Sequence, residues 1–391
     1  MASSVPNHEK PIGGKPKAAV KSRKVLWVAP NLNHYKSRFL NRLAVDGDLD
    51  LVVLAGVQRI DEGHRAAELK KEYEVISIQV DKPRFGLSVL VFFAFLRLIV
   101  SRRFDVVLLP SEKKLLPLIV VAWAMRPFMR FKLASYNHPM VRSGTVQKTR
   151  RDVWFSRIMF LFYDRVVFYT ENSRQRAVET GLISPEKASF ANNTLDTNEI
   201  WSNYTFEINR CEPKTILYVA RLIRSKGVRD LLDYFHALSA KLPQLRLIVI
   251  GDGPQAELIK SAAQKCPRII WYGAVVDEVK IANCMRKAHV VFMPGASGLS
   301  IVHAFCYGKP YVTLAEGRYP HGPEFSYLSD GVNGLVLDGD MSHNVDRLIS
   351  LMSCDKRYTE MCKAARDSAK ALSVNEWCRQ MGHALTSPAV R

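Results

Sequence analysis

Apolar residues along the chain fall into short continuous runs, separated by longer segments with a helical pattern. Continuous runs rich in Val, Ile and Leu are typical of parallel strands that helices cover on both faces. In the first half the predicted strands are residues 25–29, 51–54, 75–80, 106–109, 132–136 and 165–169. In the second half they are residues 215–219, 245–250, 269–272, 290–293, 311–313 and 334–337. Two such sets predict an α/β protein with two Rossmann-like, doubly wound parallel sheets.

The chain has 391 residues, and one hydrophobic core usually stops growing at about 250–300 residues. We therefore expect two domains, an N-terminal one over residues 24–200 and a C-terminal one over 215–370, joined by a linker over 201–214. Residues 1–23 mix Ser, Pro, Gly and Lys without apolar periodicity, which predicts a disordered basic tail. Residues 371–391 are expected to form a last helix that could cross back to the first domain.

The seven cysteines all lie in the second half of the chain and form no Cys-x-x-Cys pair. An odd, dispersed set is typical of reduced thiols, so we expect a cytoplasmic protein without a disulfide framework. The cysteines also lack metal-ligand spacing, and no metal site is expected. The basic tail has no apolar stretch of the kind that a secretory signal requires.

The formal net charge of the chain is +19, and the segment from Arg97 to Arg151 contains 12 Lys and Arg but only two acids. This segment overlaps two apolar runs, residues 87–100 and 115–131, whose clean apolar stretches are shorter than the ~18–20 residues that span a bilayer. The runs are either buried core helices with solvated basic ends or a surface that rests on anionic lipid headgroups. No nucleic-acid-binding module is visible, so a nucleic-acid partner is not expected.

Two cations, Arg221 and Lys226, follow the predicted strand 215–219. Open parallel sheets bind ligands at the carboxyl ends of their strands, so loops in this position are candidate sites. An arginine can bind phosphate through two hydrogen bonds, a lysine adds a compact charge, and Gly227 permits a close approach of the backbone. Taken alone, this spacing usually marks a solvated basic loop.

Further glycine-containing motifs follow the later strands. They are Gly-Asp-Gly-Pro at 251–254, Tyr-Gly-Ala-Val at 272–275, Gly-Leu-Ser-Ile-Val-His-Ala at 298–304, Gly-Lys-Pro at 308–310 and Asp-Gly-Val-Asn-Gly at 330–334. With Arg-x4-Lys-Gly, this ordered set resembles the C-terminal domain of family 4 glycosyltransferases, over roughly residues 215–338. Residues 192–197 resemble the segment before the interdomain linker of that family. The resemblance implies a GT-B fold, in which two Rossmann-like domains face a central cleft.

The resemblance implies that Arg221 and Lys226 neutralise the diphosphate of a nucleoside-diphosphate (NDP) sugar donor as it leaves. Backbone N–H groups at a helix start would bind the phosphates, and the turn at 273–275 would face the nucleobase. The implied donor-binding residues are Arg221, Lys226, Gly253, Gly273, Ala274, Val275, Gly298, Leu299, Ser300 and His303.

The sequence departs from the family pattern at its Glu-x7-Glu pair, which is replaced by Gly295 and His303. His303 could still hydrogen-bond the ribose hydroxyls, whereas Gly295 has no side chain with which to touch the sugar. Glu324 follows the next strand and could supply the missing carboxylate. It could equally be an acid that is favoured at a helix start by the macrodipole.

In the first half, His138 follows the predicted strand 132–136 and resembles a family histidine near sugar and acceptor. A purely structural role for it stays open. The loop after the first strand lacks the glycine pair of many relatives, and Lys36 and Arg38 could compensate.

These features predict a retaining, metal-independent glycosyltransferase with an NDP-sugar donor and no cofactor. Front-face displacement is the expected mechanism, and His138, Arg221, Lys226 and Glu324 are the expected catalytic residues. The acceptor would be a glycan or a polyprenyl-linked saccharide, in polysaccharide or glycoconjugate biosynthesis. The basic apolar segment suggests attachment to the cytoplasmic face of a membrane. A nucleotide-sugar epimerase and a catalytically degenerate sugar-nucleotide-binding protein are the alternatives, and the lost Glu pair favours the second.

Overall fold

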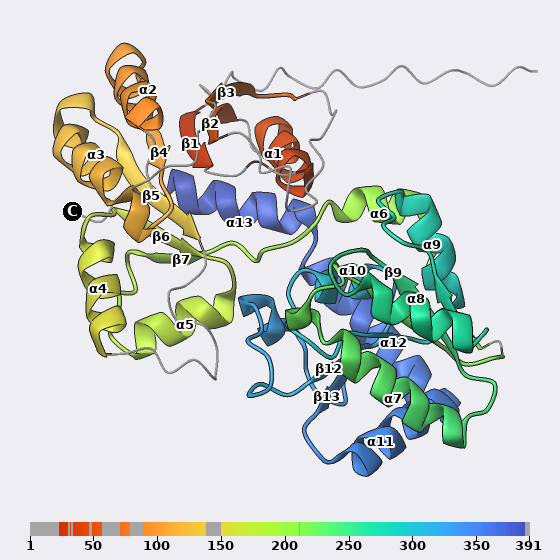
Figure 1. The fold of residues 1–391 in the computed structure, drawn as a ribbon. Coiled ribbons are helices and arrows are strands. Elements are labelled where there is room, and N and C mark those ends of the chain that lie inside the picture. Colours follow the sequence, from red (N-terminus) through yellow and green to blue (C-terminus); the bar gives the residue numbers. More distant parts are fainter. Residues whose placement is uncertain are drawn as a thin grey trace, which may run out of the picture.

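The computed structural model describes residues 23–29, 32, 34–46, 49–56, 71–78, 89–137, 150–210 and 212–387. These residues form two parallel sheets, each covered by helices (Figure 1). The expected α/β architecture with two doubly wound sheets is therefore confirmed.

The first sheet has seven parallel strands in the order β3-β2-β1-β4-β5-β6-β7. Its strands are β1 (Arg23–Ala29), β2 (Leu49–Gly56), β3 (Glu74–Ile78), β4 (Val106–Leu108), β5 (Lys132–Asn137), β6 (Arg165–Phe168) and β7 (Ala188–Phe190). The first six match the predicted strands. The seventh is an edge strand of three residues, too short for its hydrophobic pattern to stand out in the sequence.

The second sheet has six parallel strands in the order β10-β9-β8-β11-β12-β13. All six were predicted, and they are β8 (Thr215–Val219), β9 (Arg246–Ile250), β10 (Ile269–Trp271), β11 (Val290–Phe292), β12 (Tyr311–Leu314) and β13 (Gly334–Leu337). Strand order reverses between β8 and β11, as it does between β1 and β4 in the first sheet. Crevices for ligands form at such switch points.

Different helices cover the two faces of the first sheet (Figure 1). The helices α2 (Val89–Ser101), α3 (Leu116–Met129), α4 (Arg150–Leu161) and α5 (Glu171–Glu179) lie on one face, where Phe95, Leu118 and Met159 are buried. On the other face, α1 (His34–Asp46) packs beside α13 (Val374–Thr386). The apolar runs 87–100 and 115–131 thus form helices with one buried face each.

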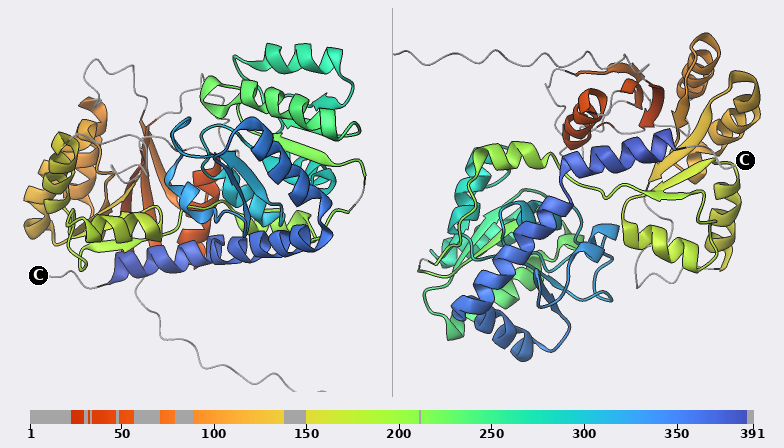
Figure 2. Two further views of the ribbon diagram at one scale, coloured as in Figure 1. Left: turned by 90° about the horizontal axis from the view of Figure 1, so that it is seen from below. Right: turned by 180° about the vertical axis from the view of Figure 1, so that it is seen from behind.

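The last helix, α13, leaves the second domain and packs along the first sheet, as Figure 2 shows. Its buried residues recur every three or four positions, which gives a single apolar stripe. Trp377 is the largest side chain of this stripe, and its indole N–H donates a hydrogen bond to the Tyr136 hydroxyl at 3.0 Å. Ser373 caps the helix by accepting from the N–H of Glu376, which fixes where α13 begins.

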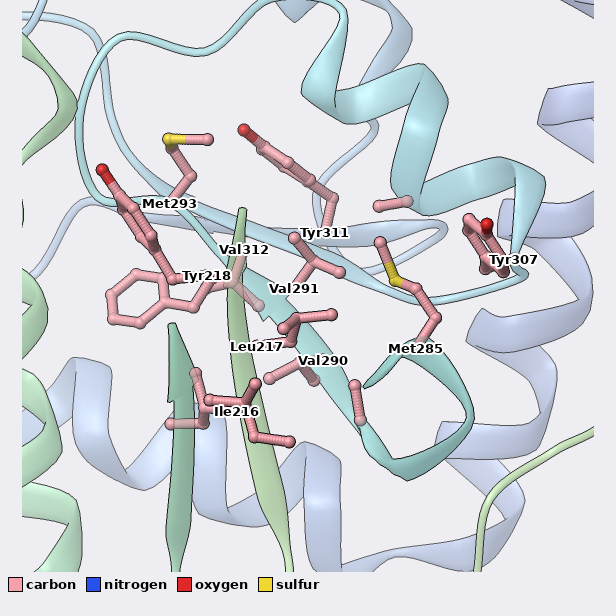
Figure 3. Packing of buried hydrophobic residues seen from close by; sticks show 14 of the residues in the cluster. Ile216, Leu217, Tyr218, Met285, Val290, Val291, Met293, Tyr307, Tyr311 and Val312 are labelled. Atoms are coloured by element: carbon pink, nitrogen blue, oxygen red, sulfur yellow. The ribbon is translucent and has the colours of Figure 1, made fainter. Parts of the chain in front are cut away.

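The second sheet is surrounded by the helices of the C-terminal half. These are α7 (Val228–Lys241), α8 (Ala256–Lys265), α9 (Glu278–Lys287), α10 (Ser300–Cys306), α11 (Met341–Ser353) and α12 (Asp355–Ala371), with α6 (Thr197–Asn203) in the connection from the first domain. Figure 3 shows how Leu217 of β8, Val291 of β11 and Tyr311 of β12 pack in the core beneath the switch point. This core fixes the strands whose following loops carry the motifs.

Several hydrogen bonds join the two halves of the molecule near residues 192–194. The hydroxyl of Tyr327 donates to the carbonyl of Tyr169 at 3.1 Å. The Asn193 side-chain amide donates to Glu324 at 2.6 Å, and the N–H of Asn192 donates to Gln380 of α13 at 2.8 Å. The segment predicted to precede the linker therefore contacts both domains.

Candidate active site

The loop after β8 lies against the loop after β11, with the two backbones in direct contact. The N–H of Ala296 donates to the carbonyl of Ser225 at 2.7 Å, and the ammonium of Lys226 donates to the Ala296 carbonyl at 2.5 Å. A Cβ atom on Gly295 would stand 2.2 Å from the carbonyl carbon of Lys226. Only glycine fits this position, so a glutamate there is incompatible with this arrangement of the loops.

Lys226 and Arg221 are electrostatically coupled. Burial lowers the pKa of Lys226, the positive charge of Arg221 lowers it further, and the carboxylate of Glu324 raises it. Arg221 itself is exposed. The two predicted phosphate-binding cations are therefore neighbours, and a second negative group beside them would be stabilised by both.

Glu324 lies on the 3-10 turn η4 (Pro323–Tyr327) and is only 3% exposed. One carboxylate oxygen accepts the 2.6 Å hydrogen bond from Asn193. The other faces the β11 loop, because it lies 3.6 Å from the place where a Cβ on Gly298 would stand. Glu324 therefore joins the N-terminal half to the loop that was predicted to hold the phosphates.

Just before α10, the backbone N–H groups of Gly298 and Leu299 are free to donate hydrogen bonds to a ligand. Within the described ranges neither N–H has a protein acceptor. The hydroxyl of Ser300 is engaged with the Tyr311 hydroxyl at 2.8 Å. Because α10 has only seven residues, these individual N–H groups matter more here than the dipole of the helix.

His303 points toward the start of α9. Its Nε2 lies 2.8 Å from the Glu278 carboxylate, to which Tyr307 also donates a hydrogen bond at 2.5 Å. Burial alone would raise the pKa of Glu278, but His303, Tyr307 and the charge of Arg38 together hold this pKa below its ordinary value. At the position of the missing family glutamate, the chain thus presents a histidine that carries a carboxylate behind it.

Two glycine motifs stack beside the β8 loop. A Cβ on Gly253 would stand 2.7 Å from the carbonyl oxygen of Leu222, so the Gly-Asp-Gly-Pro turn also requires glycine. The N–H of Gly251 donates to the carbonyl of Gly273 at 2.7 Å. Gly273 has a φ of +68° and open space on its Cβ side, and Ala274 and Val275 continue the turn. The predicted base-binding turn is thus adjacent to the loop that carries Arg221.

Sequence reasoning did not assign a role in the site to three residues that support it in the structure: Asn193, Glu278 and His321. His321 is buried, accepts from the N–H of Ser297 at 3.0 Å and lies 3.0 Å from the Leu314 carbonyl through its other nitrogen. Burial lowers the pKa of His321, which favours the neutral ring that accepting from Ser297 requires. Its only signal in the sequence was a polar residue in the segment between β12 and η4.

The N-terminal predictions are covered only in part by the structure. His138 lies outside the described residues. Burial lowers the pKa of Lys36, and Arg38 forms an ion pair with Glu199 of α6. A cavity of about 300 Å³ lies beside this pair, and its lining also includes Arg42 and Asp196. Arg38 therefore links α1 to α6.

The residues that form this site lie in a region that matches a known protein family. Residues 204–368 match the family model of group 1 glycosyl transferases. The C-terminal domain belongs to this family. The predicted family resemblance is confirmed.

Curated relatives match the same part of the chain. The GDP-mannose-dependent alpha-mannosyltransferase of Corynebacterium glutamicum is 28% identical over 172 residues, 43% of this chain and 38% of that protein. The phosphatidylinositol N-acetylglucosaminyltransferase gpi3 subunit of Schizosaccharomyces pombe is 21% identical over 193 residues, 45% of this chain and 41% of that protein. The chain thus spans about two fifths of the length of these relatives.

The solved structure of Anabaena HepE in complex with UDP is similar over nearly the whole molecule. Its TM-score is 0.65 at 16% identity, and the match covers 93% of this chain and 100% of that one. This likeness and the two parallel sheets show the GT-B fold that the motifs implied.

Within the described ranges, no group of three His, Cys, Asp or Glu side chains could hold a metal ion. Among the same residues, none of the helices has the length and apolarity needed to cross a bilayer.

Proposed function

We propose that this protein transfers a sugar from an NDP-sugar to a glycan or lipid-linked saccharide, with retention of anomeric configuration and without a metal ion. Its donor would be held by the C-terminal domain and its acceptor by the N-terminal one. The family assignment supports the reaction class. The relatives named above, a mannosyltransferase and a phosphatidylinositol N-acetylglucosaminyltransferase subunit, are consistent with a role in glycoconjugate biosynthesis.

The observation that carries this proposal is the contact between Lys226 and the β11 loop. The 2.5 Å hydrogen bond to the Ala296 carbonyl holds the lysine beside the start of α10, and Arg221 acts on its pKa from nearby. A diphosphate that accepts from the N–H groups of Gly298 and Leu299 would lie within the field of both cations. Hydrogen bonds between charged partners are the stronger ones, so this loop suits a phosphate better than a neutral ligand.

In the proposed reaction, the bond between the anomeric carbon and the donor phosphate oxygen breaks as the acceptor oxygen bonds to the same carbon. The acceptor hydroxyl gives its proton to the departing phosphate oxygen, so the products are a glycoside and a nucleoside diphosphate. Arg221 and Lys226 would stabilise the charge that develops on the leaving group, which is the role a metal ion has in other enzymes. This front-face displacement needs no carboxylate nucleophile.

Glu324 is the carboxylate that we assign to the sugar side of the site. It lies next to Gly298, and its second oxygen is held by Asn193. The positive partial charge that develops on the sugar ring would be stabilised by this fixed negative group. His303, backed by Glu278, is assigned to the ribose hydroxyls, and His138 is assigned to the acceptor side. Both assignments follow from the family resemblance.

The reaction is tested by incubating the protein with radiolabelled UDP-, GDP- and ADP-sugars, with and without membrane extracts as a source of acceptor. Transfer, or slow hydrolysis to the nucleoside diphosphate, supports the proposal. Interconversion of two sugars would instead identify an epimerase. Addition of EDTA should leave the turnover unchanged, and a strict requirement for a divalent cation would refute metal independence.

Variants then test the residues. Arg221→Ala and Lys226→Ala should each reduce kcat by roughly 10²–10³-fold, by analogy with the loss of one oxyanion-hole donor. Arg224→Ala is a matched control, because this exposed arginine lies on the same loop. Wild-type kinetics in the first two variants would remove the diphosphate assignment.

A second candidate function is nucleotide-sugar binding without turnover. It is favoured by Gly295, because the side chain that touches the sugar in the family cannot be accommodated there. Calorimetry separates it from the first proposal: tight binding of a nucleotide sugar without transfer or hydrolysis in any condition would favour the binding protein.

A further inference from the structure

Exposed apolar side chains are concentrated on three helices of the N-terminal domain. Of the 16 exposed large hydrophobic residues in the described ranges, ten lie on α2, α3 and α4. The most exposed aromatic ones are Phe128 at 79%, Trp154 at 66% and Phe93 at 60%. Single exposed apolar residues are ordinary on a protein surface, whereas a concentration of this kind marks an interaction site.

These side chains are not the edge of the domain core. The opposite faces of α2 and α3 already bury Phe95, Leu98, Leu118 and Ile119 against the first sheet. Both helices are therefore apolar on the outward face as well, which is unusual for helices at a water-exposed surface. Something other than water is expected to cover the outward face.

The three helices form one continuous surface. The helices α2 and α3 pack together, and the ring of Trp123 on α3 meets Phe162, just after α4, edge to face at 5.7 Å. The ammonium of Lys113 lies over the ring of Phe155 of α4 at 4.9 Å. Figures 1 and 2 show α2, α3 and α4 on the side of the first sheet that is turned away from the second domain. We call the outward faces of α2, α3 and α4 the apolar basic face.

Positive charge surrounds the apolar side chains. Exposed arginines stand at Arg97 on α2, Arg103 just after it, Arg130 at the end of α3 and Arg157 on α4. Neither α2 nor α3 contains an acidic residue. An apolar centre with a cationic rim matches a bilayer surface whose headgroups are anionic, because the rings enter the acyl boundary while the arginines meet the phosphates.

The backbone at Arg130 adds an independent observation. This residue has a φ of +58° and is the one non-glycine residue with a positive φ among those described. Glycine is the residue usually found at such a helix end, because it adopts this conformation without strain. The chain instead keeps an arginine there, two residues after Phe128, so the strained position presents a cation beside the most exposed ring.

We infer that the apolar basic face docks the protein on an anionic lipid bilayer. The helices lie in the interface and do not cross it, with Phe93, Phe128 and Trp154 as apolar anchors and Arg97 and Arg130 as headgroup contacts. Docking does not depend on the proposed sugar transfer, since lipid binding and turnover are measured separately. If both are correct, the face holds the N-terminal domain next to a lipid-linked acceptor.

Co-sedimentation of the full chain with vesicles tests the inference. Vesicles that contain phosphatidylglycerol should bind the protein at about 0.1 M salt and release most of it at about 0.5 M, because screening shortens the reach of the charges. Pure phosphatidylcholine vesicles should bind roughly tenfold less. Equal binding to both lipids, or none to anionic vesicles at low salt, would overturn the inference.

Two variants locate the face. Phe128→Ser with Trp154→Ser should lower affinity for anionic vesicles at least tenfold, whereas the control Val332→Ser, at an exposed apolar residue of the second domain, should not. Arg97→Glu with Arg130→Glu should abolish binding at low salt, with Lys356→Glu and Lys363→Glu on the exposed side of α12 as the charge-matched control. Nucleotide affinity should stay unchanged in all of them, which also shows that they fold. Wild-type binding by the first two variants, or a dimer in lipid-free solution that the serine variant dissociates, would refute lipid docking.

Discussion

Lys309 is a lysine without a hydrogen-bond partner in the core of the C-terminal domain. Its side chain is fully buried, and its ammonium has no partner within the described ranges. It belongs to the Gly-Lys-Pro motif, which follows the same helix, α10, whose start we assign to the donor phosphates. Lys309 could bind the donor, or it could be a buried charge that only costs stability. Lys309→Met distinguishes these two cases, because methionine fills a similar volume without a charge.

The size of the effect follows from the titration of Lys309. Burial lowers its pKa from 10.5 to about 8, against smaller opposite effects of Cys362 and Glu207. At 1.36 kcal/mol per pKa unit, this difference corresponds to about 3 kcal/mol. Below pH 8 the amine is charged in the folded and the unfolded chain, so the folded state bears this whole cost. Between pH 8 and 10.5 the folded protein has lost the proton and the unfolded one keeps it, so stability rises with pH.

Lys309→Met should therefore raise the free energy of unfolding at pH 7 by up to ~3 kcal/mol. Its advantage over the wild type should shrink as the pH approaches 10.5. Urea denaturation followed by fluorescence at both pH values measures this difference, and Lys356→Met on the exposed side of α12 should change neither. A variant that is less stable than the wild type at pH 7 would show that the buried charge has a partner. A loss of nucleotide affinity would show that Lys309 contacts the donor.

Three more predictions concern the site and its support. Gly295→Glu, which puts back the residue of the family, should abolish nucleotide binding in calorimetry, because its Cβ would stand 2.2 Å from the Lys226 backbone. Glu278→Gln should destabilise the protein at pH 7. Because the folded pKa of Glu278 lies below the ordinary 4.5, the stability that this carboxylate contributes is complete above pH 4.5 and is lost as the pH falls through the folded pKa. The denaturation curves of the variant and the wild type should therefore converge in acid. Trp377→Ala should reduce the free energy of unfolding by about 3–5 kcal/mol and expose α13 to proteolysis, while a stable variant would show that α13 is dispensable.

The sheets could be predicted because their signal is local. Parallel strands covered on both faces must be apolar at nearly every position, and a run of four or five Val, Ile and Leu residues is visible in any sequence. β9, with Leu-Ile-Val-Ile, is of this kind. β7 is not, because three residues at the edge of a sheet need few apolar side chains.

The motif loops could be predicted for a related reason. A glycine that must approach another backbone leaves a trace in the sequence, and Gly227, Gly251 and Gly253 all make such approaches. The sequence near those glycines gives no sign of which distant segments they contact. The contacts of Asn193 with Glu324 and of Gln380 with Asn192 join residues 131 and 188 positions apart, and only the folded chain brings them together.

At the replaced Glu pair, the fold supplies a physical reason that the sequence does not contain. From the sequence, Gly295 suggests the loss of a catalytic side chain and hence a degenerate site. In the fold, that glycine is what lets the β11 loop lie against residues 225–227, and the same approach places the Lys226 ammonium on the Ala296 carbonyl. Any side chain at 295 would push the lysine away from the loop that it is proposed to serve. We propose that the carboxylate on the sugar side comes instead from another strand end, namely from Glu324, which is buried beside Gly298 and held by Asn193.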